Sequence, residues 1–327
     1  MAWRLKLVPE KTNWDFFQWQ TLTFGISVFA VVASIVITLV MGLNFGIDFK
    51  GGTTIRTESG QPIDLGAYRT ALEGLKMGDV SITEVFDPSF GPDKHVAMVR
   101  IQEQAGQQAL APEDVQRVQT ALQTVAPDVK FAAVETVGPK VSGELIRSAV
   151  LSVLAATVAI CIYVWLRFEW QFSIGAVASL VHDVVVTIGI FALFQIKFDL
   201  TTIAALLTIL GYSINDTVVV FDRLRENLMK YKTMPLRDVM NLSVNETLSR
   251  TLMTSLSTLI ALGSLLIFGG DVIRSFVFAI FIGILLGTYS SIYVAKNVVL
   301  YLGVKRDWSK PGADKGGPKG TRFATGP

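Results

Sequence analysis

The stretch LTTIAALLTILGYSINDTVVVF, residues 200–221, decides the fold class of this chain. It is long and apolar enough to cross a bilayer as a helix, which takes about 20 residues. Asp216 is its one formal charge. A carboxylate at this depth costs at least about 2.5 kcal/mol on membrane-insertion scales, so Asp216 is predicted to serve a function.

The composition is that of a membrane protein. Hydrophobic residues make up 51% of the 327 residues and charged residues 17%, against about 25% charged residues in soluble domains. The net charge of +2 is too small to suggest a nucleic-acid partner. Six runs pass the same length test: 21–45, 148–166, 172–194, 200–221, 251–269 and 275–295. The first is too long for the core of a signal peptide, so we interpret it as an uncleaved anchor.

Lysine and arginine gather at one end of the six predicted spans. They occur in residues 1–20, in the loop between the fourth and fifth spans, and in the tail 303–327. The two short loops at the other end carry only Lys197 and Arg274. By the positive-inside rule both termini are predicted to be cytoplasmic and residues 46–146 external. The basic tail, rich in Gly and Pro, is predicted to be disordered.

Residues 46–146 are predicted to form an α+β domain. Strand patterns at 53–57, 80–86, 96–101 and 129–134 alternate with helix patterns at 63–77 and 112–125, and the FGPD sequence at 90–93 indicates a turn. The order βαββαβ is typical of a ferredoxin-like fold. The segment contains no Ser-His-Asp set, metal-ligand cluster or phosphate loop, and His95 is interpreted as an ordinary surface or strand residue. We predict a binding or docking module.

Polar side chains recur within three of the predicted spans. The fourth span places Thr208, Tyr212, Asn215 and Asp216 on one helical face with Ser213 beside them, the fifth opens with Arg250 and Thr254, and the third carries His182 and Asp183 near its centre. We expect the three faces to meet, because lipid would leave them unsatisfied. We also expect Asp216 and Arg250 to lie at similar depth on neighbouring helices.

Asp216 and Arg250 are the predicted proton relay. A carboxylate that alternates between a dry contact and a guanidinium changes its proton affinity, and structural contacts alone would be served by Asn without the charge penalty. The hydroxyl residues are interpreted mainly as helix-packing groups. For His182 and Asp183 a relay and a polar core both stay open. The G-x-x-x-G spacing at 283–287 indicates close packing, either within the chain or between subunits.

Long motifs connect the chain to a known family. They are GIDFKGGT at 46–53, VGPKV at 137–141, RFEWQ at 167–171, HDVVVT at 182–187, GYSINDTVVVFDRLREN at 211–227, RTLMTS at 250–255 and SSIYVA at 290–295. With these motifs in this order, the chain resembles the SecF family of protein-export membrane subunits. The resemblance extends from about residue 14 to residue 302. That family is similar to proton-driven resistance-nodulation-division transporters.

The resemblance implies a protein of the bacterial inner membrane that pairs with SecD as a second six-helix half. It further implies contact with the Sec channel, its associated export subunits and the translocating unfolded polypeptide. The resemblance also implies that protons serve as the coupling ion, with no cofactor, no metal and no hydrolytic chemistry, and that the proton-motive force promotes late translocation. Asp216 and Arg250 match the positions that the family links to proton passage.

Three other interpretations are consistent with some of these features. Half of a small-solute pump would usually have a much larger external domain. An intramembrane aspartyl protease would use Asp183 and Asp216, but the GxGD context is absent, since Asp216 lies in GYSIND. A purely structural scaffold would tolerate Asp216→Asn.

Overall fold

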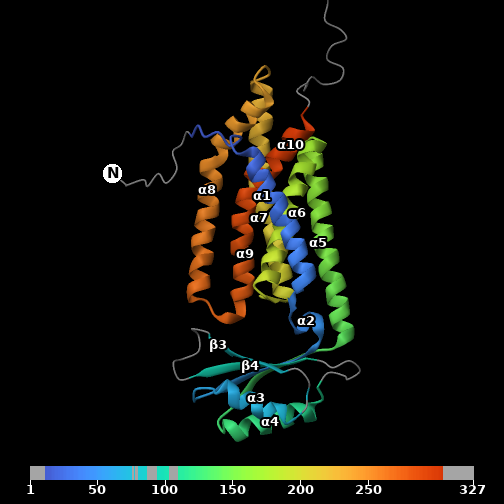
Figure 1. Ribbon diagram of the computed structural model, residues 1–327, viewed down its shortest axis with the longest axis vertical. Helices are drawn as coiled ribbons and strands as arrows, with labels where there is room; N and C mark the ends of the chain where they lie inside the picture. The colour runs from blue at the N-terminus through green and yellow to red at the C-terminus, as the bar shows by residue number, and fades with distance from the viewer. Residues whose placement is uncertain (1–11, 76, 78–79, 87–93, 103–109, 305–327) are drawn as a thin grey trace, which may run out of the picture.

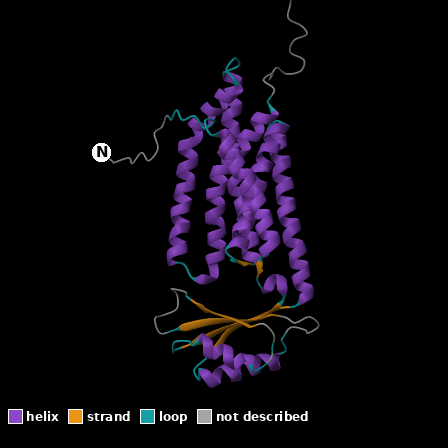
Figure 2. Cartoon of the chain, viewed as in Figure 1, coloured by secondary structure: helices purple, strands orange, loops and turns teal. Residues whose placement is uncertain are grey.

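The computed structural model describes residues 12–75, 77, 80–86, 94–102 and 110–304 (Figure 1). A bundle of long helices forms one part of the molecule, and an α+β domain lies across one end of it (Figures 1 and 2). The predicted turn at 90–93 and nearly all of the predicted basic tail lie outside the described residues.

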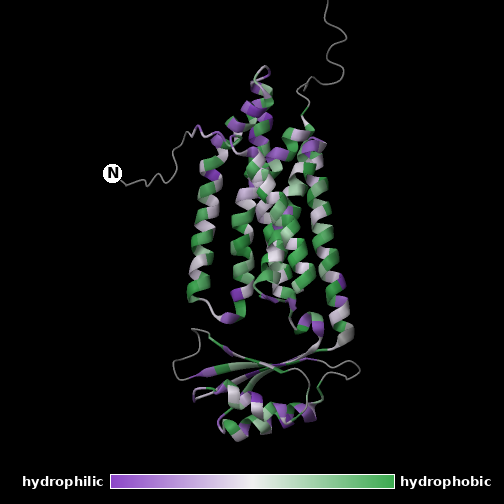
Figure 3. Ribbon diagram, viewed as in Figure 1, coloured by the Kyte–Doolittle hydropathy of each residue, from purple (hydrophilic) through white to green (hydrophobic). Residues whose placement is uncertain are grey.

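Six helical segments among the described residues are long and apolar enough to span a membrane. They are α1 (Gln20–Met41), α5 (Pro139–Arg167), α6 (Trp170–Leu193), α7 (Leu200–Lys230), α8 (Leu236–Phe268) and a composite of α9 (Asp271–Ser290), the π-helix η1 (Ser291–Ala295) and α10 (Lys296–Leu302). Apolar residues cover most of their length (Figure 3). The predicted class of helical membrane protein is therefore confirmed.

Several helices extend well beyond the predicted spans. Hydropathy detects only the part of a helix that contacts lipid, whereas the helix continues wherever its polar residues find partners. The last turns of α7 and the first turns of α8 provide such polar partners for each other. Arg223 Nε lies 2.7 Å from Glu246 Oε2, and Asn227 Nδ2 donates to Ser243 Oγ at 3.0 Å. Helices α7 and α8 therefore continue beyond the predicted spans 200–221 and 251–269 into the connection between them.

The start of α7 is set by local chemistry. The Asp199 carboxylate accepts the backbone N–H of Thr202 at 3.1 Å, and the Thr202 hydroxyl accepts the N–H of Asp199 at 3.4 Å. This reciprocal capping box satisfies two backbone donors that a helix start would otherwise leave free.

Helix α6 is the most buried of the membrane helices, and α9 packs closely on α7. Of the most apolar window of each helix, 56% is buried in α6, against 11% in α1, α5 and α8. A methyl group added at Gly283 would collide with Ile209 of α7, and one at Gly287 would lie 3.1 Å from the Ser213 Cβ atom. The G-x-x-x-G pair therefore packs within the chain, which decides between the two alternatives left open by the sequence.

The α+β domain contains a four-stranded antiparallel sheet with the order β3-β4-β2-β5. The elements are β2 (Gly52–Ser59), α3 (Leu65–Glu73), β3 (Val80–Val85), β4 (His95–Gln102), α4 (Pro112–Val125) and β5 (Lys130–Val137). Their order along the chain is the predicted one. Both helices cover the sheet face that points away from the bundle (Figure 1). Tyr68, Leu72, Val118 and Leu122 pack there against Val99.

Side-chain oxygens fix two loops of this domain. Asp64 caps α3 by accepting the N–H groups of Gly66 and Ala67 at 2.8 and 3.1 Å. The Asp128 carboxylate accepts the N–H of Gly60 at 2.6 Å and the hydroxyl of Ser59 at 3.1 Å. The Gly60 hydrogen bond above all holds the pKa of Asp128 below its ordinary value of 3.8.

The junction between the two parts contains elements that the sequence analysis missed. A two-residue strand, β1 (Asn44–Phe45), pairs in parallel with β6 (Lys197–Phe198), and the short helix α2 (Ile47–Lys50) follows it. Such short strands carry no readable periodicity. Gly51 and Gly52 adopt φ values of 77° and 128°, which favour glycine. The four-stranded sheet begins at Gly52, one residue before the predicted strand at 53–57, after this connecting segment.

Candidate functional site

The first polar cluster surrounds the fully buried carboxylate of Asp183, near the centre of α6. Its Oδ2 accepts hydrogen bonds from Ser213 Oγ at 2.6 Å and from Ser290 Oγ at 2.8 Å. Its Oδ1 lies 2.9 Å from His182 Nδ1. Ser179 Oγ lies 2.8 Å from Ser290 Oγ and is the donor, because the Ser290 proton already goes to Asp183. We call these five residues the Asp183 cluster.

The Asp183 cluster provides its carboxylate with well-placed donors from α6, α7 and α9. A buried carboxylate is tolerated when it is hydrogen-bonded in this way. A neutral His182 that donates through Nδ1 keeps Nε2 as an acceptor. His182 also lines an apolar groove of about 520 Å³ between α1, α5 and α6. The structure thus places His182 and Asp183 in a polar core, while a relay role for them stays a prediction.

The second cluster surrounds Asp216, which faces a different neighbour. Its side chain is 3% exposed, and Oδ2 accepts one hydrogen bond, from Ser255 Oγ of α8 at 3.4 Å. Ser255 Oγ also lies 2.7 Å from Thr288 Oγ1 of α9. The Thr288 proton goes to the carbonyl of Ile284 at 2.8 Å, so the single Ser255 proton serves either Thr288 or Asp216. We call Asp216, Ser255 and Thr288 the Asp216 cluster.

The two buried carboxylates therefore differ in how well they are satisfied. Asp183 receives two short hydroxyl hydrogen bonds and contacts an imidazole, whereas Asp216 shares one long hydrogen bond. An ionised carboxylate without donors is costly in an apolar interior. Of the two carboxylates, Asp216 would therefore be stabilised more by binding a proton or by an approaching cation.

Arg250 does not contact Asp216 in this conformation, and its side chain is exposed. No ion pair within 4.0 Å joins these two described residues. The hydrogen bonds Tyr212–Thr258 and Asp216–Ser255 fix the antiparallel register of α7 and α8. In that register Arg250 lies level with residue 220, one turn or about 6 Å from Asp216. The two residues thus lie on neighbouring helices, as expected, with about one turn between them along the helix axes.

The predicted polar face of the fourth span divides among several neighbours. Ser213 joins the Asp183 cluster, and Tyr212 Oη lies 3.3 Å from Thr258 Oγ1. Asn215 and Thr208 are exposed on this chain. On α8, Thr254 is exposed and donates back to its own helix, to the carbonyl of Arg250 at 3.1 Å. The three polar faces meet only in part, and a strip from Asn215 to Arg250 stays on the surface.

Site prediction did not include Ser255, Thr288 and Ser290, which supply the hydroxyls around the two carboxylates. Thr288 and Ser290 lie in the sixth span among apolar residues. Single hydroxyl residues are common in membrane helices, so the sequence held no signal that separates these from the others.

The N-terminal end of α9 is tied to the α+β domain. The Asp271 carboxylate accepts the N–H of Phe86 at 2.8 Å, and the N–H of Asp271 donates to the Phe86 carbonyl at 2.9 Å. Arg274 Nη1 lies near the other Asp271 oxygen, at 2.6 Å. Phe86, the residue directly after β3, is thus joined by two hydrogen bonds to the helix that carries Thr288.

A polar cleft of about 220 Å³ lies beside this contact, between the sheet and the bundle. Arg100 of β4 lines it, and burial lowers the pKa of its guanidinium while the charges of Asp199 and Asp48 oppose that shift. Burial would raise the pKa of Asp199, but hydrogen bonds from Thr201 and the nearby Lys197 hold it below its ordinary value. Opposite charges therefore face each other across the junction.

Comparisons with known proteins agree with this architecture. The family model for the C-terminal part of the protein-export membrane proteins SecD and SecF matches residues 117–305, and the SecD/SecF GG motif matches residues 36–63. The protein translocase subunit SecF of Cereibacter sphaeroides is 68% identical, with 99% of each chain covered. That of Rhodobacter capsulatus is 65% identical, with 95% of each chain covered.

Solved structures show the same fold. The crystal structure of SecDF from Thermus thermophilus, described as a translocon-associated membrane protein, matches with a TM-score of 0.79 and 34% identity. A super-membrane-facing form of SecDF matches with a TM-score of 0.64 and 35% identity. Each match covers 90% of this chain but 39% of the solved chain. The fold, the GG motif and full-length identity place this chain in the SecF family of protein translocase subunits.

Proposed function

We propose that this chain is a proton-coupled accessory subunit of Sec protein export, which works with SecD to promote late translocation of polypeptide. One observation carries the proposal: Asp216 is buried within a membrane-spanning bundle and has a single shared hydrogen bond. A group in this state readily exchanges a proton for a cationic partner when the helices move.

The exposed polar strip supports the presence of a second helical bundle, contributed by a partner subunit. Asn215 and Arg250 are exposed beside Asp216, and polar groups of this kind are unfavourable against lipid. A partner bundle that covers the strip would bury these polar groups and complete the route that protons take past Asp216. The solved relatives are SecDF proteins whose chains are more than twice as long as the matched part. We therefore propose SecD as the second six-helix half.

Charge distribution supports a bacterial inner-membrane location with both termini cytoplasmic and the α+β domain periplasmic. The basic residues of the α7–α8 connection lie at the end of the bundle opposite the domain (Figure 1). The strand order and the two helices on one face support a ferredoxin-like fold for the domain. We propose that it contacts the emerging unfolded polypeptide.

In the proposed mechanism, proton loss from Asp216 creates a charge that attracts Arg250 from about one turn away. Movement of α8 toward this contact changes the hydrogen bond from Ser255 to Thr288 of α9. About 25 Å along α9, Asp271 holds Phe86 of the α+β domain. The proton state of Asp216 is in this way linked to the position of the domain. Protons are the only coupling ion, and no hydrolytic step or bound cofactor is required.

The alternatives find less support. A protease dyad needs two carboxyl groups that share a proton at about 3 Å. Among the described residues, Asp183 and Asp216 instead bond to hydroxyls on different helices. For a solute pump, the described part of the α+β domain contains a single sheet with two helices, and its described polar cleft holds only about 220 Å³.

The test is export by inverted membrane vesicles that contain the chain paired with SecD. Asp216→Asn is expected to leave the pair assembled and to abolish the part of export that depends on the proton gradient. Asp222→Asn is the matched control, because Asp222 lies on the same helix but is half exposed and paired with Arg167. Normal gradient-dependent export by the assembled Asp216→Asn pair would refute the proposal and favour a structural scaffold.

A further inference from the structure

The described chain starts with a segment, residues 12–19, that lies across the end of the bundle away from the α+β domain (Figure 1). We call it the strap. Asn245 Oδ1 of α8 accepts the N–H of Trp14 at 2.9 Å, and Asn241 Oδ1 accepts the N–H of Phe16 at 2.9 Å. Both amide groups also donate to the Trp14 carbonyl, at 2.9 and 3.0 Å. Two asparagines one turn apart thus hold the strap backbone.

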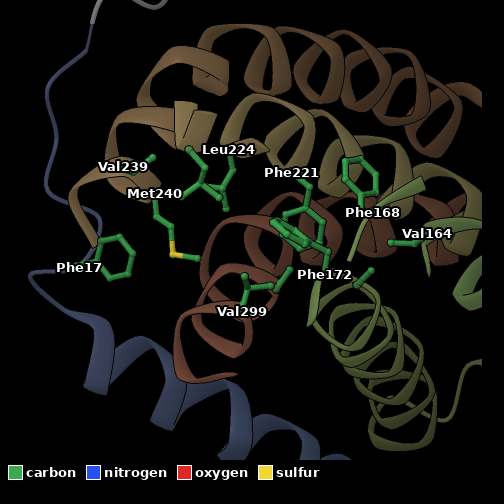
Figure 4. Packing of buried hydrophobic residues seen from close by; sticks show 12 residues of the cluster. Phe17, Val164, Phe168, Phe172, Phe221, Leu224, Val239, Met240 and Val299 are labelled. Atoms are coloured by element: carbon green, nitrogen blue, oxygen red, sulfur yellow. The ribbon is translucent and has the colours of Figure 1, made fainter. Parts of the chain in front are cut away.

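Lys296 holds the strap from the other side. Its side chain is 1% exposed, and Nζ lies 3.7 Å from the centre of the Phe17 ring and 3.4 Å from the carbonyl oxygen of Phe16. The Phe16 and Tyr293 rings lie 5.7 and 5.6 Å from the same nitrogen. A cation enclosed by aromatic rings in a desolvated site is attracted to the faces of those rings. Phe17 itself packs toward Met240 of α8 (Figure 4).

The Phe16 side chain completes an apolar layer inside the bundle. It packs with Val220 of α7, Val244 and Leu248 of α8, and Ile292 of η1, all of them buried. Val220 lies one turn, about 6 Å, beyond Asp216 in the direction of the strap. The strap backbone is bonded at residues 241–245, which lie farther from Asp216 than Leu248 does. This layer therefore separates the Asp216 cluster from the strap end of the bundle.

One polar group lies between the Asp216 cluster and this layer. Thr251 is one turn from Ser255 on α8, is 2% exposed, and its hydroxyl oxygen has no hydrogen-bond partner among the described residues. A buried hydroxyl without a partner is costly, and a water molecule is the small group that satisfies it. From the Asp216 carboxylate toward the strap, the side chains are therefore the hydroxyls of Ser255 and Thr251, followed by the apolar layer.

We propose that Phe16 is a gate residue for proton passage, closing the path between Asp216 and the aqueous phase at the strap end. The gate can move because the strap is not part of a helix. Two amides and one ammonium group hold its backbone, while Arg237 near Asp15 and Phe17 and the Asn245 carbonyl that accepts from Thr12 hold its side chains. These contacts break without unfolding α7, α8 or α9. Withdrawal of Phe16 leaves Val220 and the Thr251 hydroxyl open to water. This inference rests on the proposed function of Asp216.

Cysteine labelling tests the gate without any measurement of transport. Cys161 is the only cysteine, so Val220→Cys in a Cys161→Ser background gives one thiol behind Phe16. In the pair with SecD, Phe16→Ala is expected to raise labelling by a water-soluble maleimide, added at the strap end, by about tenfold, which corresponds to about 1.4 kcal/mol in the opening equilibrium. Phe16→Leu, which keeps apolar bulk, should preserve slow labelling.

Two further variants separate a gate from general loosening. Asn245→Ala keeps Phe16 but weakens the strap, and should also raise labelling. Trp19→Ala removes a strap aromatic that is 61% exposed and should leave labelling unchanged. Unchanged labelling in an assembled Phe16→Ala pair would overturn the gate, as would an equal rise in the Trp19 variant.

Proton entry into liposomes then connects the gate to Asp216. Phe16→Ala is expected to raise proton entry by about the same factor as labelling, and added Asp216→Asn should remove the increase. Labelling could become faster in Phe16→Ala while the added proton entry persists in the double variant with Asp216→Asn. This result would show that Phe16 is a barrier to water, but it would overturn both the gating of Asp216 and the proposed relay. A failure of the gate and a failure of the relay are thus distinguishable.

Discussion

Substitution of Asp271 by alanine is predicted to loosen the α+β domain from the bundle. The change removes the acceptor of the Phe86 N–H and leaves the backbone hydrogen bond from Asp271 to the Phe86 carbonyl. A hydrogen bond to a charged group contributes about 1.5–3 kcal/mol. The Asp271 side chain is 29% exposed, which places the loss near the lower value, about 1.5 kcal/mol. The population with an open contact should therefore rise about tenfold.

Hydrogen exchange at the Phe86 amide measures this opening directly, because its described acceptor is the Asp271 carboxylate. We expect protection of that amide to fall about tenfold in Asp271→Ala. Asp238→Ala is the matched control: Asp238 also lies in the first turn of a membrane helix, α8, but at the opposite end of the bundle. Unchanged protection of Phe86, or an equal loss in the control, would refute the assigned role of Asp271.

Three further predictions concern stability. Asp183→Asn should lower the free energy of unfolding in detergent by about 1–3 kcal/mol, because an amide oxygen kept toward Ser213 and Ser290 would turn the amide NH2 toward the Nδ1–H of His182 and would remove the charge that strengthens these hydrogen bonds, while Ser264→Ala at an exposed position should be neutral. Gly283→Ala should cost about 1–3 kcal/mol through overpacking, whereas Gly211→Ala, with open space around it, should stabilise α7; equal effects would contradict the packing. The pKa of the Asp128 carboxyl is lowered in the folded chain, so its ionised form should stabilise the α+β domain above about pH 4 and lose that effect as the pH falls below 3.8. The difference in stability between the original chain and Asp128→Asn should therefore disappear in acid, and a difference that persists there would refute the sign of this effect.

The sequence predicts the elements of this fold well because their signals are local. A run of about 20 apolar residues has few alternatives to a membrane helix. Alternation with turn residues between strands likewise fixes the order of the α+β elements. The helix at 112–125 is predicted to the residue, because Pro112 marks its start and Val118 and Leu122 its buried face.

The partners of the site residues are not local and are harder to predict. Ser213 and Asp216 differ by about 60° around the helix axis, enough for one to face α6 and the other α8. Which of the two meets which neighbour depends on how all the helices pack. The depth of Arg250 depends on where α8 begins, and Leu236 starts it within a stretch too polar for a hydropathy window.

The strap shows the same limit most clearly. Lys296 and Phe16 are 280 residues apart in sequence, and no spacing rule connects them. In the sequence, Lys296 is a single basic residue directly after the sixth apolar run. Its burial among aromatic rings follows from the position of the strap and has no signal in the sequence around it.

The most direct test of the central claim is the rate of proton flux through the chain paired with SecD in liposomes under an imposed gradient. The account predicts that Asp216→Asn abolishes the flux that the pair adds to empty liposomes, while Asp222→Asn retains it. Flux that persists in the assembled Asp216→Asn pair would contradict the claim that Asp216 carries the proton.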